Sequence, residues 1–93
     1  MITAIVMINA DRNSIPETAQ RIADIEGVSE VYSVSGEFDI VAILKVKQYE
    51  DLAALVTEHL LKMPEIASTR TLMAFRTFSK SDLEHAFDIG LDE

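Results

Sequence analysis

Residues 28–46 read VSEVYSVSGEFDIVAILKV and contain two strand-like runs. The runs cover residues 28–35 and 38–46, and only Gly36-Glu37 stands between them. Because Gly tolerates positive φ, a two-residue Gly-x connection is the signal of a type II′ β-hairpin. The second run is apolar at nearly every position, which is typical of a strand buried on both faces of a sheet.

Upstream of this hairpin the sequence predicts a strand followed by a helix. Residues 2–9 form a short apolar run rich in Ile and Val, as strands do. Ser14-Ile15-Pro16-Glu17 has the spacing of a capping box, in which the Ser and Glu side chains satisfy backbone N–H groups at a helix start. Pro16 is tolerated in the first turn, and Gly27 is a candidate left-handed stop.

Downstream, a second helix and a fourth strand follow. One apolar stripe at helical spacing predicts the helix, and Pro64 ends it; the stripe consists of Tyr49, Leu52, Ala53, Val56, Leu60 and Met63. Residues 67–78 are rich in Thr and read as a strand. Ser81-Asp82-Leu83-Glu84 is a second capping box, and a short C-terminal helix would present Leu83, Ala86 and Phe87 on one face.

The order β-α-β-β-α-β predicts an α+β, ferredoxin-like fold with helices on one face of an antiparallel sheet. The strand order would be 4-1-3-2, because the first and third strands are the most apolar and the second and fourth carry the polar residues of edges. We expect one domain over residues 1–80, with residues 81–93 as its C-terminal helix and tail.

The predicted sheet is apolar on both faces, yet two helices can cover only one. In an isolated chain Ile5 and Met7 with Val41 and Ile43, or else the alternate set, would face water. Burying four or five such side chains contributes about 1.5–3 kcal/mol each, comparable with the roughly 5–15 kcal/mol stability of a small domain. We therefore expect a second copy to cover the open face, as in dimeric α+β barrels. The alternative is that the C-terminal helix folds back over it.

Composition excludes several classes of function. The chain has 93 residues, a net charge of -8 and no Cys. Its eight Lys and Arg residues are scattered, so we expect no direct binding to nucleic acid. Disulfides and Cys-based zinc sites are excluded. The apolar start is too short for a membrane span and lacks the positive charges of a signal peptide, so we expect a cytoplasmic protein without a membrane anchor.

The stretch from residue 22 to residue 41 resembles the effector-binding domain of Lrp/AsnC transcription factors, also called the domain for regulation of amino-acid metabolism. The family pattern has a helix ending in Gly-Val, a strand, and Gly-x-aromatic-Asp at a hairpin; here these are Gly27-Val28 and Gly36-Glu37-Phe38-Asp39. A later Pro-Gly-Val and Thr-x-Thr appear as Pro64-Glu65-Ile66 and Thr69-Arg70-Thr71, with Glu65 in place of the family's Gly.

The resemblance implies a sensor rather than an enzyme. Family members usually carry an N-terminal helix-turn-helix domain, whereas this sequence opens with the first strand of the effector domain. A stand-alone sensing domain is therefore expected, with no DNA-binding part and no cofactor. Similar domains form dimers and rings of dimers, bind small molecules such as amino acids between subunits, and co-assemble with full-length regulators.

A free amino acid needs an acceptor for its ammonium, donors for its carboxylate and a pocket for its side chain. Asp39 is the candidate acceptor, backbone N–H groups around Gly36 are candidate donors, and Thr69 and Thr71 offer hydroxyls on one strand face. Ser35, Glu37 and Phe38 belong to the same hairpin. The simpler alternatives are a turn role for Gly36, a bond from Asp39 to its own hairpin backbone, and ordinary strand roles for the threonines.

Two further functions stay open. Small monooxygenases share this topology, but they need a polar catalytic group inside, and the inner positions here are apolar. A ligand-free assembly adaptor is the other possibility. No metal site is expected, since His59 lies at the margin of the helix stripe and His85 lies opposite the apolar face of the last helix.

Overall fold

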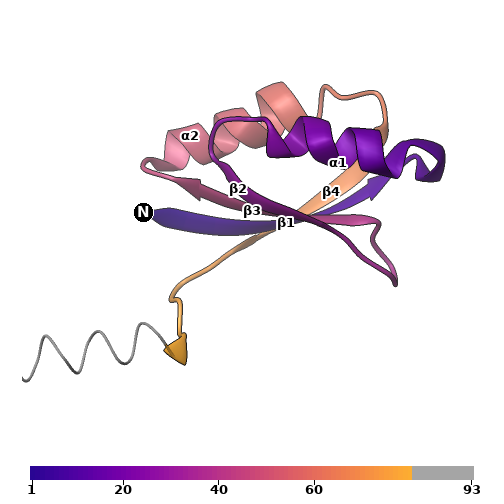
Figure 1. The fold of residues 1–93 in the computed structure, drawn as a ribbon. Coiled ribbons are helices and arrows are strands. Elements are labelled where there is room, and N and C mark those ends of the chain that lie inside the picture. Colours follow the sequence, from indigo (N-terminus) through magenta and orange to yellow (C-terminus); the bar gives the residue numbers. More distant parts are fainter. Residues whose placement is uncertain (81–93) are drawn as a thin grey trace, which may run out of the picture.

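The computed structural model describes residues 1–80, and its elements follow the predicted order (Figure 1). The strands are β1 (Ile2–Ala10), β2 (Val28–Ser33), β3 (Ile40–Val46) and β4 (Ile66–Met73). The helices are a 3-10 turn η1 (Arg12–Ser14), α1 (Ile15–Ala23), α2 (Tyr49–Ala54) and a π-helical segment η2 (Leu55–Leu60) that continues α2. The predicted C-terminal capping box and helix lie outside the described residues.

The four strands form one antiparallel sheet in the order β2-β3-β1-β4. This is the predicted order read from the other edge, so the prediction of the fold is confirmed. In the centre of the sheet Ile5 stands opposite Ile43, and Met7 stands opposite Val41. The most apolar strands are therefore the two inner ones, where both neighbours protect their backbone from water.

Both helices lie on the same side of the sheet (Figure 1). Beneath them every second residue of β1 and β3 is fully buried, as the two-residue period of a strand requires; these residues are Ala4, Val6, Ile8, Ile40, Ala42 and Leu44. Ile22 of α1 and Leu52, Leu55 and Leu60 of the second helix complete this core. The structure thus decides which of the two alternating sets faces the helices.

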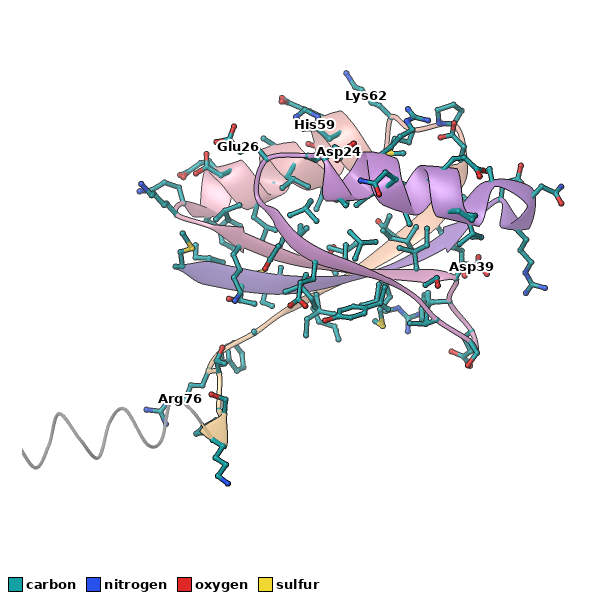
Figure 2. The ribbon with its side chains drawn as sticks, in the orientation of Figure 1. Asp24, Glu26, Asp39, His59, Lys62 and Arg76 are labelled. Atoms are coloured by element: carbon teal, nitrogen blue, oxygen red, sulfur yellow. The ribbon has the colours of Figure 1, made fainter. Side chains whose placement is uncertain are left out.

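The opposite set forms an open face. Ile5, Met7, Val41 and Ile43 are only half-buried, and nothing in residues 1–80 packs over them as a layer (Figure 2). Tyr32 and Leu72 flank them on the edge strands, each with 48% of its surface exposed. The mismatch that the sequence predicts between an apolar sheet and its helical cover is therefore present in the described part of the chain.

The predicted two-residue turn at Gly36-Glu37 is wrong. The last strand pair is Ser33 opposite Ile40, and the Val34 N–H donates to the Asp39 carbonyl at 3.0 Å, which leaves residues 35–38 as the connection. The Asp39 N–H in turn donates to the Ile8 carbonyl at 2.9 Å. Asp39 is thus bonded through its backbone to both β1 and the end of β2.

The start of α1 also differs from the prediction. Ser14 makes no capping bond; instead η1 precedes the helix, and the Asp11 carboxylate accepts from the Asn13 N–H at 2.9 Å. Pro16 lies in the first turn, as predicted. The helix ends at Ala23, and Gly27 has φ +99°, so the left-handed glycine lies beyond the helix end, at the entry to β2.

The second helix and the residues just after it bury Leu52, Leu60 and Met63 of the predicted stripe but not the whole stripe. Tyr49 and Ala53 are exposed, whereas Leu55 is only 4% exposed. From Leu55 the helix has π spacing, and the Leu61 N–H donates to the Val56 carbonyl five residues back at 2.9 Å. Leu55 and Leu60, five residues apart, are both buried; Leu60 belongs to the predicted stripe and Leu55 does not.

Strand β4 ends at Met73 and not at residue 78 as predicted. Its neighbour β1 begins at Ile2, and the last bond between them runs from the Ala74 N–H to the Thr3 carbonyl at 2.9 Å. Beyond this point no strand remains to pair with, and the chain leaves the sheet on the side away from the helices (Figure 1). No helix among residues 1–80 combines the length and hydrophobicity needed to cross a membrane.

Candidate functional site at the β2–β3 hairpin

Asp39 is the most firmly held of the predicted ligand residues. Its Oδ2 accepts from the Ala10 N–H at 2.9 Å, and its Oδ1 lies 3.5 Å from Arg12 Nε. The Asp39 side chain is 18% exposed. Its partner is thus the end of β1 and not its own hairpin. A carboxylate has about four acceptor positions, so these two contacts leave room for a ligand's ammonium group.

The tip of the hairpin is open. Ser35, Gly36 and Glu37 are exposed, and Gly36 has φ +115°. A Cβ on Gly36 would meet no atom within 4 Å. The backbone conformation therefore accounts for the glycine within one subunit, and the loop backbone stays accessible to a ligand or to another subunit.

Phe38 makes a cation–π contact with Arg70 beside the hairpin. The guanidinium carbon of Arg70 lies 5.8 Å from the centre of the Phe38 ring, a cation–π distance. Arg70 comes from β4, opposite Met7 of β1. The sequence does not predict either Arg70 or Arg12 as part of the site. Both come to lie beside the hairpin through the pairing of β1 with its two neighbours, and no local motif indicates that pairing.

The two threonines of β4 lie on the helix side of the sheet. Thr69 stands opposite Ile8 and Thr71 opposite Val6, both of which are buried under the helices. Thr69 is half-buried and Thr71 is exposed. Since Asp39 bonds to Ile8 from the other side, Asp39 and Thr69 flank the same part of β1, whereas Thr71 is two residues farther along.

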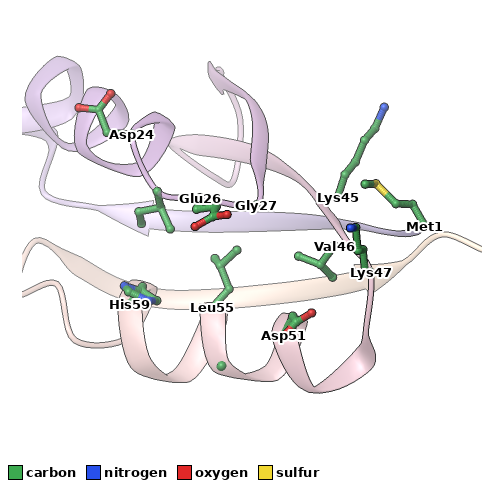
Figure 3. Close-up of a pocket in the computed structure, with 12 residues that line it drawn as sticks. Met1, Asp24, Glu26, Gly27, Lys45, Val46, Lys47, Asp51, Leu55 and His59 are labelled. Atoms are coloured by element: carbon green, nitrogen blue, oxygen red, sulfur yellow. The ribbon is translucent and has the colours of Figure 1, made fainter.

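Two clefts lie away from these residues. The larger, of about 770 Å³, opens between the α1–β2 connection and the second helix (Figure 3), and its lining includes the charged or polar residues Asp24, Glu26, Lys45, Asp51 and His59. The smaller, of about 290 Å³, is bordered by Glu58, His59 and Lys62 among others. His59 is exposed and borders both clefts, so its predicted place at the core margin is wrong.

Metal binding has no support in the described part of the chain. Residues 1–80 contain no group of three or more His, Asp or Glu side chains placed to hold an ion. Within residues 1–80 the candidate site consists of hydrogen-bonding and charged groups, chiefly the Asp39 carboxylate, the neighbouring Arg12 and the open hairpin backbone.

Comparison with known proteins gives a consistent result. The model of the family described as Lrp/AsnC ligand binding domain matches residues 3–83. An uncharacterized HTH-type transcriptional regulator of Pyrococcus furiosus is 35% identical over 84% of the chain and 54% of that protein. The chain spans about half the length of the curated relatives it matches. These relatives are named as regulators, which agrees with the prediction that the chain is not an enzyme.

Solved structures share the fold. A protein of Thermus thermophilus superimposes with a TM-score of 0.79 at 39% identity, covering 86% of this chain and 100% of that one. The feast or famine regulatory protein of M. tuberculosis, solved in complex with L-methionine, superimposes with a TM-score of 0.69 at 25% identity, covering 86% of this chain and 54% of that one.

Proposed function

Because the chain belongs to the Lrp/AsnC ligand binding domain family, we propose that it is an effector-sensing assembly module: it self-associates through its open sheet face and binds an amino acid or similar small molecule beside the β2–β3 hairpin. The observation that carries the proposal is the half-buried apolar face of β1 and β3, which nothing in residues 1–80 covers. The module acts in the cytoplasm on transcription and does not itself contact DNA.

Self-association follows from the free energy of the open face. Removing Ile5, Met7, Val41 and Ile43 from water contributes at most about 1.5–3 kcal/mol for each side chain, and less here because each is already half-buried. Together with Tyr32 and Leu72 they form an apolar patch of the kind that marks a protein interface. A homodimer covers the patch with the same patch of the second copy.

The effector site uses the hairpin and β4. Asp39 accepts from the ligand ammonium, and the backbone around Gly36 donates to its carboxylate. Ser35, Glu37, Phe38, Thr69 and Thr71 provide further contacts. Within one subunit these groups lie on both sides of β1 and line neither of the two clefts described above. A neighbouring subunit therefore completes the pocket, and binding favours the assembly that completes it. The L-methionine complex of the M. tuberculosis relative supports an amino acid as the class of ligand.

The negative charge supports an indirect role in transcription. At a net charge of -8, the chain repels the phosphates of DNA. Its curated relatives are named HTH-type regulators and are about twice as long as the matched region. Co-assembly with a full-length regulator through the same surfaces gives the module a route to a promoter.

A thermal-shift panel of the twenty amino acids, combined with sizing by light scattering, tests the proposal. At millimolar concentration at least one amino acid should raise the Tm of the wild-type protein and shift its assembly, because a ligand that binds only the native state stabilises it. Asp39→Asn should lose the shift. Asp24→Asn, which removes an exposed carboxylate at the end of α1, should keep it. Assembly without any response to the twenty amino acids would contradict sensing and favour a ligand-free adaptor.

A further inference from the structure

The open face carries opposite charges on its two edge strands. On β2 the Tyr32 hydroxyl donates to Glu30 Oε2 at 2.6 Å. On the opposite edge Arg70 of β4 lies with its guanidinium over the Phe38 ring, 5.8 Å from the ring centre. One edge therefore presents a phenol and a carboxylate, and the other contributes a guanidinium that rests against the hairpin residue Phe38 within one subunit.

Strand register places these groups in two adjacent rows across the face. Tyr32 pairs with Val41, Val41 with Met7, and Met7 with Arg70. The next row runs from Glu30 through Ile43 and Ile5 to Leu72. Directly paired residues share one face of a sheet, so both rows belong to the open face, and each places apolar side chains between its two edges.

Two copies that pack face to face around a two-fold axis can align their edges in two ways. An axis across the strands places each β2 against the partner's β2, so that the two Glu30 carboxylates share one edge and the two arginines the other. An axis along the strands places each β2 against the partner's β4. Since like charges across an interface cost free energy and opposite charges steer association, the charges favour the axis along the strands.

The same axis also places each row of one copy opposite the same row of the second copy. Arg70 then faces the row that ends in the partner's Tyr32, and the partner's Glu30 is one row, about 7 Å, away along the strand, in the direction opposite to Phe38. To reach Glu30 of the partner subunit, the Arg70 guanidinium exchanges the Phe38 ring for the carboxylate. Packed sheets lie about 10 Å apart and rotate by roughly 30°. A long Arg side chain and a Glu side chain that approach from opposite sheets span this separation.

We infer that Arg70 of each copy docks on Tyr32 and Glu30 of the second copy, and that this pair of ionic contacts sets the orientation of the dimer. The inference rests on the face-to-face assembly proposed above. It also explains why charged residues border a face that is otherwise apolar. Burying the Glu30 carboxylate at an interface without a cation costs free energy, and the Tyr32 hydroxyl occupies only one of the acceptor positions of that carboxylate.

Charge reversal tests the inference by sedimentation equilibrium. Glu30→Arg and Arg70→Glu should each weaken the dimer by about tenfold or more, and the double variant should recover to within about threefold of the wild type, because the swapped charges again attract. Glu58→Arg and Lys62→Glu are matched controls on the helix side, where both residues are exposed. They make the same changes in net charge and should leave the dissociation constant within about twofold.

The outcomes separate this inference from the proposed function. A wild-type protein that stays monomeric at high concentration would overturn both. If the wild type is a dimer and neither reversal changes its dissociation constant, the inference alone is overturned. The same holds if the double variant dimerises as weakly as the two single effects combined. Far-UV circular dichroism establishes that each variant is folded, and rescue in the double variant shows that neither reversal acts by unfolding the chain.

Discussion

At the scale of single residues, Gly27 and Gly36 share a left-handed backbone but have different surroundings. A Cβ on Gly27 would lie 2.8 Å from Leu55 Cδ1 and 3.2 Å from Val46 Cγ1, whereas a Cβ on Gly36 would meet nothing within 4 Å. Gly36→Ala should therefore cost only backbone strain, about 1 kcal/mol, and Gly27→Ala should add overpacking for a total of about 2–4 kcal/mol. Urea unfolding of both variants measures the difference, and equal losses would contradict it.

The backbone contact of Asp39 gives a second residue-scale prediction. Asp39→Ala removes the acceptor of the part-buried Ala10 N–H and should lower the free energy of unfolding by about 1–2 kcal/mol. Asp39→Asn keeps an oxygen there and should cost less. Arg12→Ala removes only the ion pair, whose Arg12 side chain is 86% exposed, and should change stability by less than about 0.5 kcal/mol. A larger loss for Arg12→Ala would show that the ion pair is the stronger contact.

Tyr32 gives a pH-dependent signal. The hydrogen bond to Glu30, then the Glu30 charge, raise the pKa of Tyr32 above its ordinary value of 10.0. A raised pKa in the folded state contributes stability that is complete below the unfolded value and is lost as the pH rises through the folded value. With two tyrosines and no Trp in the chain, Tyr49→Phe leaves Tyr32 as the only phenol. Adding Glu30→Gln to that variant should lower the midpoint of the absorbance titration at alkaline pH; an unchanged midpoint would contradict the bond.

At the scale of elements, the pattern of hydrophobic residues predicts the four strands and both main helices of residues 1–80, but not the η1 turn or the ends of the strands. At the hairpin the strand pairing stops at Ser33 and Ile40, and residues 35–38 form the connection. Strand β4 stops where β1 has no residues left to pair with. In the candidate site the hairpin motif predicts Asp39 and Phe38, but Arg12 and Arg70 reach them through strand register. A single sequence does not specify that register.

The π-helical segment gives an element-scale prediction in which pattern and structure disagree. The predicted stripe includes Tyr49 and Leu60 and leaves out Leu55, whereas in the structure Tyr49 is exposed and both Leu55 and Leu60 are buried. Leu55→Ala and Leu60→Ala should each lower the free energy of unfolding by about 2–4 kcal/mol, and Tyr49→Ala by less than about 0.5 kcal/mol. Denaturant unfolding of the three variants tests this. A large loss of stability for Tyr49→Ala together with a small one for Leu55→Ala would instead support the stripe predicted from the sequence.

At the scale of the whole molecule, the uncovered face links stability to concentration. If a second copy covers Met7, the native state is stabilised by mass action and the Tm should rise as the protein is concentrated. Met7→Glu places a carboxylate in the centre of the face, where leaving water unpaired costs several kcal/mol, so the dissociation constant should rise by more than about 100-fold.

The Tm of the Met7→Glu variant should then no longer depend on concentration. Ala53→Glu, which adds the same charge at an exposed position of α2, should keep the wild-type dependence. Differential scanning calorimetry over a wide concentration range, with light scattering on the same samples, makes the comparison. A wild-type Tm that is independent of concentration would contradict self-association through the apolar face of the two central strands. The next test would then be whether residues 81–93 or another molecule covers that face.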